Sequence, residues 1–361
     1  MAGYPEAAAG LRVGSRQLQD VVRAVFAACG MPPAGAALLA DSLVWADLRG
    51  IHSHGVLRVA EYVEKLTSGG VDPRGQPRLV RERVSALVVD GGNSMGQLAA
   101  AFAMDLAIER ARSTGVAVAA VGGSNHCGAL SWYAVRALEH GMIGVAATNA
   151  LPTMAPWGGV DKIVGINPLA VALPSAGEAP VVLDCAFSYS SHGKIRVFAQ
   201  RGLPIPPTWA FDREGRPTTD AQEAIGGLLQ PIGEYKGVGL AVVFGLLSTA
   251  LSGASYGTDL GDMTTGPLPG RDGHFCMAID VTAFTDPDAF RSRVDRAVRQ
   301  IRSSRLAAGH NTVYAPGGLE QETEARHRRD GIPLDPVTVD AIDRCARQLG
   351  TAGLSPVSPA S

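Results

Sequence analysis

Two histidines and an arginine lie close together in the segment GIHSHGVLRV, residues 50–59. His52 and His54 flank Ser53, and Arg58 follows His54 by four positions. A histidine can exchange a proton near neutral pH, and an arginine can hold a carboxylate with two parallel hydrogen bonds. Because residues four apart lie on one side of a helix, the spacing predicts an acid/base group and a carboxylate grip that face one pocket.

A second segment with chemical potential is GGSNHCGALSWY, residues 122–133, which follows an apolar strand pattern and leads into a helical one. His126 lies in its glycine-rich turn and is expected to face the end of a sheet, where ligands of α/β proteins gather. Taken alone, His126 is either a functional group or a histidine that bonds only to loop carbonyls.

A metal site would need the three histidines and Asp184 as one ligand set. The His-x-His pair lies at a helix start rather than on a strand, and Asp184 has no companion carboxylate at ligand spacing. A serine hydrolase would need a G-x-S-x-G turn, which the sequence lacks. We therefore expect no metal, and a metal-dependent hydrolase or lyase is the weaker alternative.

The elements that must position these residues change type along the chain. Helical periodicity dominates the first seventy residues, and from about residue 85 short apolar strands alternate with helical runs. This pattern predicts an α/β protein in three parts, which are a helical lobe (1–75), an α/β cofactor- and substrate-binding domain (76–285) and a helical C-terminal segment that packs on the first lobe and ends in a frayed tail (286–361).

An uncharged stretch at residues 237–257 is nearly long enough to span a membrane, but glycines and serines interrupt it. We expect a buried core helix there and no membrane partner. The segment also holds GVGLAV, which supplies only two glycines of the G-x-G-x-x-G turn of Rossmann folds. A dinucleotide would therefore need a different scaffold.

The composition narrows the class of protein. The 361 residues carry a net charge of −2 and no basic stripe, which disfavours nucleic acid as a partner. Five widely spaced cysteines without a C-x-x-C pair argue against a disulfide framework, and no secretory signal opens the chain. We expect a cytoplasmic protein that acts on small molecules.

Several motifs occur in a fixed order, and together they are far more specific than any one of them: DLRGIHSHGVLRV, GGSNHCGAL, GINPLAVALP, VVLDCA, RGLPIPPTWAFDREGRPTTD, YKGVGLAVV and YAPG. Over about residues 15–330 the sequence resembles the type-2 malate/L-lactate dehydrogenase family. The GIHSHG form is most similar to that of its ureidoglycolate dehydrogenases.

The resemblance implies a homodimeric NAD(P)-dependent oxidoreductase with a non-Rossmann cofactor domain and a mixed β-sheet. Its reaction would be hydride transfer between the nicotinamide of NAD or NADP and C2 of a small 2-hydroxy or 2-oxo acid of the malate, lactate or ureidoglycolate type. Reduction of a cyclic imino acid, such as piperideine- or pyrroline-2-carboxylate, is the alternative within the family. A family member that only binds ligands stays open as a third reading.

The resemblance also implies roles for particular residues. His54 with Ser53, and His126, match the family's proton-transfer positions, and Arg58 matches its substrate-carboxylate ligand. We favour His54 as the proton donor, His126 as an orienting or alternative acid/base group, and a His52 that points away from the pocket. The matching cofactor segments contain Asp184, Cys185, Ala186, His192, Tyr235, Lys236, Pro316 and Gly317. Phe187 and His192 depart from the family's usual residues, which leaves the choice between NAD and NADP open.

Overall fold

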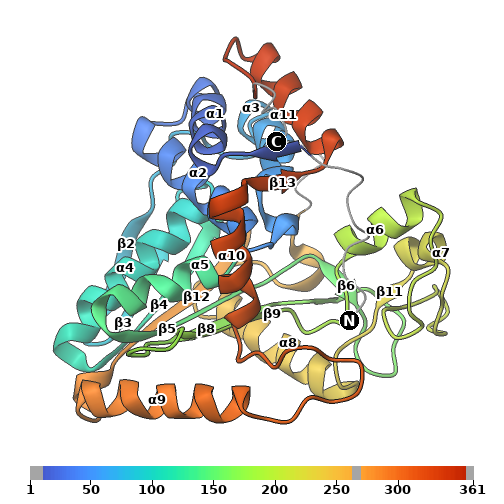
Figure 1. Ribbon diagram of the computed structural model, residues 1–361. Helices are drawn as coiled ribbons and strands as arrows, with labels where there is room; N and C mark the ends of the chain where they lie inside the picture. The colour runs from blue at the N-terminus through green and yellow to red at the C-terminus, as the bar shows by residue number, and fades with distance from the viewer. Residues whose placement is uncertain (1–10, 262–269, 355–361) are drawn as a thin grey trace.

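The computed structural model describes residues 11–261 and 270–354 (Figure 1). Its centre is a mixed seven-stranded sheet in the order β2-β3-β4-β12-β5-β8-β9, in which β3 and β4 run parallel and the other neighbours antiparallel. The predicted α/β class and mixed sheet are therefore confirmed. The strands are β2 (Arg78–Arg83), β3 (Ala86–Asp90), β4 (Val116–Ser124), β5 (Met142–Thr148), β8 (Leu169–Leu173), β9 (Val181–Cys185) and β12 (Asp272–Asp280).

Helices cover both faces of the sheet. Along β12, Cys276 and Ala278 pack in one hydrophobic cluster with α4 (Gly96–Thr114), whereas Phe275 belongs to another cluster that reaches α8 (Tyr235–Thr249). Successive residues of a strand point to opposite faces, so a strand between two helices is apolar throughout. This explains why β12 lacks the polar alternation of a half-exposed strand.

A helical lobe lies above the sheet in Figure 1 and contains α1 (Ser15–Ala28), α2 (Pro33–Leu48), α3 (Val59–Thr67) and α11 (Pro336–Gln348). The first strand, β1 (Leu11–Val13), pairs with β13 (Ile332–Leu334), which joins the two ends of the described chain. Apolar residues of these elements share one buried cluster. Two turns of 3-10 helix, η1 (His52–His54) and η2 (Val56–Arg58), connect α2 to α3.

The segment after residue 286 packs in two different places, although we expected all of it to pack on the N-terminal lobe. Helix α10 (Gly318–Asp330) contacts α2, and α11 contacts α1 and α3. Helix α9 (Pro287–Arg302) instead lies at the opposite end of the molecule (Figure 1), where Asp295 accepts backbone hydrogen bonds from residues 176–178. The domain boundaries at residues 75 and 285 stay predictions, and the tail after residue 354 lies outside the described residues.

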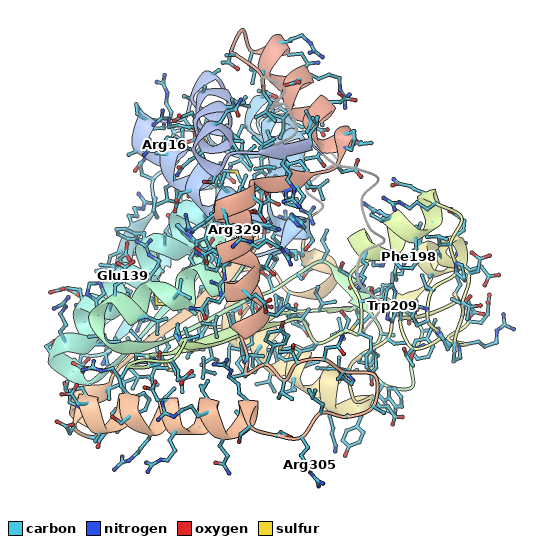
Figure 2. All side chains as sticks on the ribbon, in the orientation of Figure 1. Arg16, Glu139, Phe198, Trp209, Arg305 and Arg329 are labelled. Carbon is cyan, nitrogen blue, oxygen red and sulfur yellow. The ribbon has the colours of Figure 1, made fainter. Side chains whose placement is uncertain are left out.

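A smaller lobe projects from the right of the sheet in Figure 1, where it contains α6 (His192–Gln200) and α7 (Ala221–Gly226). Phe198 and Trp209 face each other in its core (Figure 2), with ring centroids 5.2 Å apart. The remaining short elements are α5 (Ser131–Ala134), η3 (Val135–His140), β6 (Pro152–Met154), β7 (Val164–Gly165), β10 (Ala210–Phe211), β11 (Leu228–Leu229), η4 (Gly257–Asp259) and η5 (Val281–Ala283).

Helix α8 corrects the prediction of a fully buried core helix at residues 237–257. One side packs on the sheet, but Leu240, Val243 and Leu246 on the other side are 43%, 54% and 44% exposed. Among the described residues, no helix is long and apolar enough to cross a membrane. The uncharged sequence of α8 after Lys236 thus reflects one face on the sheet and a second apolar face at the surface.

Candidate active site

A buried carboxylate shapes the turn that carries His54. Asp47, at 1% exposure, accepts a hydrogen bond from the backbone N–H of Val56 at 2.7 Å, and its other oxygen lies 2.7 Å from Nδ1 of His52. A Cβ atom at Gly55 would overlap this carboxylate. The glycine after His54 is therefore required because Asp47 occupies the space of a side chain. Asp47 opens the motif DLRGIHSHGVLRV, but the sequence gave no sign that its carboxylate turns back onto residues 52–56.

His52 and His54 take different directions from this turn. His52 bonds to Asp47, and its ring lies 5.9 Å from that of His327 on α10. His54 is half-buried, with Nδ1 3.0 Å from Oγ of Ser53. Burial, and next the nearby charge of Arg58, lower the pKa of His54 to about 4, so this imidazole is neutral at neutral pH.

Arg58 is fixed by its neighbours on the same turn. Its Nε donates to the carbonyl of Ser53 at 2.8 Å, and Nη1 donates to the carboxylate of Glu61 at 2.7 Å. We expected Arg58 to hold a carboxylate with two parallel hydrogen bonds. Two of its donor atoms, Nε and Nη1, are already engaged with Ser53 and Glu61. A substrate carboxylate would meet an oriented guanidinium and compete with Glu61 for it.

The two predicted histidines come together. The rings of His54 and His126 are nearly parallel, at 8°, with centroids 5.6 Å apart. Burial, and then the charge of Arg58, lower the pKa of His126 well below its ordinary value. Two neutral imidazoles beside one guanidinium form a site that can hold a carboxylate and exchange a proton.

The contacts that position His126 escaped the sequence analysis. Nδ1 of His126 lies 2.7 Å from the hydroxyl of Tyr62 on α3, which accepts a hydrogen bond from Nε2 of Gln97 at 3.1 Å. Tyr62 fits the apolar periodicity of its helix, so its hydroxyl gave no separate signal. Gln97 stands second in α4, next to Gly96, where a Cβ atom would overlap the carbonyls of Asn125 and His126.

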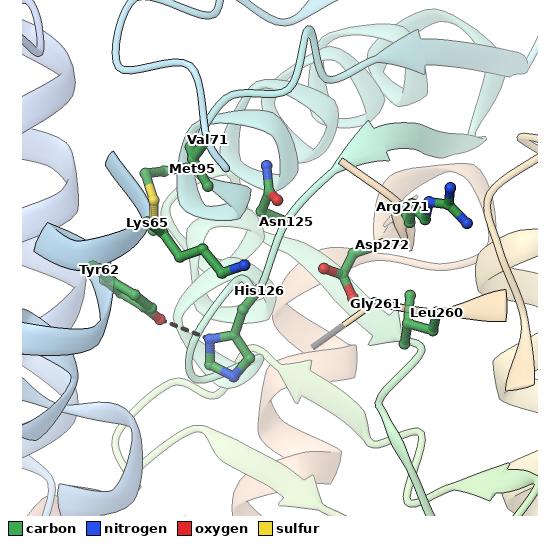
Figure 3. A pocket seen from close by; sticks show the side chains of 10 residues that line it. All are labelled: Tyr62, Lys65, Val71, Met95, Asn125, His126, Leu260, Gly261, Arg271 and Asp272. Atoms are coloured by element: carbon green, nitrogen blue, oxygen red, sulfur yellow. Dashed lines mark hydrogen bonds between the residues drawn. The ribbon is translucent and has the colours of Figure 1, made fainter. Parts of the chain in front are cut away.

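A small pocket lies beside His126 (Figure 3). Lys65, at 5% exposure, and Asp272 point into the same space from α3 and β12. Burial raises the pKa of Asp272 to about 7, although the charge of Lys65 acts in the opposite direction. The pocket therefore offers a cation and a carboxyl group next to the reacting position.

Two of the predicted cofactor segments meet at β9. Asp184 accepts hydrogen bonds from the N–H and the hydroxyl of Ser131 at 2.8 and 2.6 Å, which ties β9 to α5 and to the loop of His126. Val182 donates to the carbonyl of Pro316 at 3.0 Å, and Gly317 follows with a φ of +88° and no room for a Cβ atom against Val182.

The other cofactor segments also lie side by side. The chain that follows Cys185 and Ala186 runs along residues 230–232, since Tyr189 donates to the carbonyl of Gln230 at 2.9 Å and Ile232 donates to the carbonyl of Phe187 at 3.0 Å. Tyr235 and Lys236 begin α8 at the end of this pairing, and Tyr235 is 60% exposed. Residues 182–189 therefore contact both Pro316 and the chain that leads into Tyr235 and Lys236.

His192 has an unusual environment at the start of α6. Its Nε2 is buried and finds no hydrogen-bond partner among the described residues. Burial, followed by the charges of Lys162 and Arg196, lowers the pKa of His192 to about 4. A buried ring nitrogen without a partner in the described residues, under the influence of two cationic side chains, fits the phosphate groups of a dinucleotide.

The metal alternative finds no support in the described part of the chain, where no three histidine, cysteine, aspartate or glutamate side chains gather closely enough to hold an ion. The family model described as malate/L-lactate dehydrogenase matches residues 13–343. The chain belongs to this family. The resemblance predicted from the ordered motifs is confirmed.

Individual members of the family resemble this dehydrogenase over nearly its whole length. A malate dehydrogenase of Pyrococcus abyssi is 36% identical over 95% of this chain and 96% of its own. An NAD(+)-dependent ureidoglycolate dehydrogenase of Escherichia coli O157:H7 is 32% identical over 90% and 93%. The delta1-piperideine-2-carboxylate reductase structure from Pseudomonas syringae aligns with a TM-score of 0.83 and 30% identity over 93% and 99%.

The ureidoglycolate dehydrogenase uses NAD(+), and a (2R)-3-sulfolactate dehydrogenase of Chromohalobacter salexigens, 35% identical over 76% of this chain and 82% of its own, uses NADP(+). The protein is an NAD(P)-dependent oxidoreductase, as the resemblance predicted.

Proposed function

We propose that this dehydrogenase moves a hydride between NAD(P) and C2 of a small 2-hydroxy or 2-oxo acid, with the reacting atoms held between His54, His126 and Arg58. The observation that carries the proposal is the stacking of the two histidine rings at 5.6 Å within reach of the Arg58 charge. Hydride transfer to or from such an acid needs a carboxylate ligand and a proton-transfer group, and these three residues supply both.

In the direction of oxidation, Arg58 holds the substrate carboxylate. Nε2 of His54 takes the proton of the 2-hydroxyl group, because Nδ1 of that ring already faces Ser53. When bound, NAD(P) would supply the acceptor for the hydride of C2. In the direction of reduction, the protonated His54 returns the proton to the developing alkoxide.

The cofactor would be held by residues from the segments that meet around β9 and α8, which are Asp184, Cys185, Ala186, His192, Tyr235, Lys236, Pro316 and Gly317. The mixed sheet and the absence of a G-x-G-x-x-G turn support a non-Rossmann site. Nε2 of His192, which has no hydrogen-bond partner within the described part of the chain, supports phosphate binding there. Calorimetry with NADH and NADPH should give binding heat with at least one of them, and its absence with both would refute this assignment.

The substrate grip is tested by Arg58→Ala. Since the guanidinium binds the carboxylate in the ground state and the transition state alike, KM should rise roughly 10- to 100-fold with little change in cofactor affinity. The assay uses nicotinamide absorbance with a panel of 2-oxo acids. An unchanged KM for every acid that is turned over would contradict the assignment.

Reduction of a cyclic imino acid is the second candidate, because the piperideine-2-carboxylate reductase structure aligns with a TM-score of 0.83. The same carboxylate grip and proton donor would serve an imine nitrogen. Piperideine- and pyrroline-2-carboxylate in the assay panel decide between the two classes. Turnover of the imines without turnover of 2-oxo acids would favour this alternative.

We propose that the protein is a homodimer. The apolar surface of α8, with Leu240, Val243 and Leu246 exposed, supports burial against a second copy. Light scattering at micromolar concentration should give twice the chain mass of 37.4 kDa, and Val243→Glu should shift this toward the monomer. A monomeric mass for the unmodified protein would contradict the proposal.

A cytoplasmic location is also part of the proposal. All five cysteines are free, which agrees with a reducing compartment. Fractionation of the native host tests the location directly, and recovery outside the cytoplasm would overturn it.

A further inference from the structure

We propose that Gln97 and Tyr62 are positioning residues that keep His126 as a neutral imidazole with its hydrogen on Nε2, so that His126 donates a fixed hydrogen bond to the C2 oxygen while His54 moves the proton. This inference rests on the proposed function of the same site. It assigns different tasks to two histidines that the sequence motifs leave interchangeable.

The direction of the hydrogen bonds carries the inference. Nε2 of Gln97 donates to the Tyr62 hydroxyl at 3.1 Å, so that hydroxyl accepts from Gln97 and has one hydrogen to give. The neighbour at 2.7 Å is Nδ1 of His126. When the hydroxyl donates to Nδ1, this nitrogen is an acceptor, and a neutral imidazole then carries its hydrogen on Nε2.

Both partners of that bond stay uncharged. Burial is the main cause that raises the pKa of the Tyr62 phenol and lowers the pKa of the His126 imidazole. A single hydrogen therefore lies between the Tyr62 hydroxyl and Nδ1 of His126. Because Gln97 donates to the hydroxyl oxygen, this hydrogen belongs to Tyr62.

Gln97 is held where it cannot easily reverse this direction. Its side chain is fully buried, and Oε1 finds no partner among the described residues. Turning the amide over would place its amino group at that position instead, and buried N–H groups are left unpaired less often than carbonyls. Close packing of Gly96 on the carbonyls of Asn125 and His126 fixes the start of α4 against the loop.

The chemical consequence follows from the hydrogen on Nε2. A neutral imidazole cannot take a hydroxyl proton on a nitrogen that already bears hydrogen, and giving that hydrogen up would create an imidazolate. His126 can instead stabilise negative charge on the C2 oxygen by a hydrogen bond that is already in place. Proton transfer is left to His54, whose Nδ1 neighbour is a serine hydroxyl able to donate or accept.

Nitrogen NMR of histidine-labelled full-length enzyme tests the hydrogen position without any substrate. The protein has 8 histidines, and the signals of His126 are those lost in the His126→Gln variant. We expect a protonated Nε2 and an unprotonated, hydrogen-bonded Nδ1. A hydrogen on Nδ1 would overturn the proposal, whatever the enzyme turns over.

The role of Gln97 is tested with Gln97→Leu in the same spectra. Removal of the amide donor lets the Tyr62 hydroxyl rotate, so the two nitrogen signals of His126 should move toward each other. Unchanged signals would show that Gln97 does not set the hydrogen position and would overturn its part in the proposal. Cofactor binding by calorimetry verifies that the variant is folded.

The role of His126 is tested by kinetics. A glutamine side chain can place an N–H near the position of Nε2 but cannot transfer a proton at neutral pH. His126→Gln should therefore retain at least tenfold more of kcat than His126→Ala, a margin of about 1.4 kcal/mol, whereas His54→Gln should be no better than His54→Ala. Equal loss in both His126 variants would overturn the proposal, while absence of turnover in the unmodified enzyme with every acid and imine would refute the proposed function instead.

Discussion

The turn at residues 50–58 and the loop at residues 122–131 each present one histidine to the same site, but they are held in different ways. Asp47, only a few residues upstream, fixes the turn through the backbone of Val56 and through His52. The loop depends on Tyr62 and Gln97, which come from other helices. The geometry of the turn thus depends on residues that are close in sequence. The geometry of the loop depends on residues that reach it only when the whole domain has folded.

Loss of His54 should have the largest effect on activity. His54→Ala removes the group that moves the proton, so kcat should fall on the order of 10²- to 10⁴-fold. The measurement is steady-state oxidation and reduction with the best acid from the panel. His52→Ala is the control, because His52 faces Asp47 and His327 and should keep most of the activity. Similar losses of kcat in His54→Ala and His52→Ala would contradict the different roles assigned to these two histidines.

Loss of the Asp47 charge should weaken the turn without removing any reacting group. Asp47→Asn exchanges two charge-assisted hydrogen bonds for weaker ones, so unfolding free energy should fall by about 2 kcal/mol. Displacement of His54 should lower kcat roughly tenfold. Denaturant unfolding and kinetics measure the two effects.

Asp20→Asn serves as the matched control, because the side chain of Asp20 is 56% exposed in a surface ion pair. An Asp47→Asn protein with unchanged stability and kcat would show that the turn does not depend on its buried carboxylate.

A methyl group at residue 96 should disturb the loop and leave the turn intact. Gly96→Ala forces a Cβ atom against the carbonyls of Asn125 and His126, and such overpacking costs about 1–3 kcal/mol. Gly14→Ala is the control, since Gly14 precedes α1 with a φ of −63° and open space around it, and stability should change by only about 0.5 kcal/mol. Thermal unfolding of both variants is compared, and an equal or higher melting temperature for Gly96→Ala would contradict the close packing.

The same contrast explains how much the sequence could predict. Regular periodicity gave the α/β class and fixed spacing gave the chemistry near His54 and Arg58, whereas the mixed sheet was implied by the family resemblance. Periodicity and spacing gave no sign of Tyr62 or Gln97, because a tyrosine in an apolar stripe and a glutamine at a helix start have ordinary structural roles elsewhere. Their function depends on contacts between α3, α4 and the loop of His126, and such contacts follow only from the tertiary fold.

Two further differences have the same origin. The uncharged stretch at residues 237–257 was predicted to form a buried core helix, yet Val243 in α8 is 54% exposed. The amphipathic pattern of α9 predicted that one face of this helix is buried, but not which part of the protein that face packs against. An apolar or amphipathic sequence indicates that a face will be buried or shielded, but it does not identify the partner.

The pH dependence of kcat/KM for oxidation tests the division of tasks between the histidines most directly. His54 must be neutral to take the hydroxyl proton, so activity should fall as the pH drops through the pKa of His54, which burial lowers to about 4. The account predicts that this acid limb persists in His126→Gln and is lost in His54→Gln. Loss of the limb in His126→Gln, with its retention in His54→Gln, would contradict the account and make His126 the proton-transfer group.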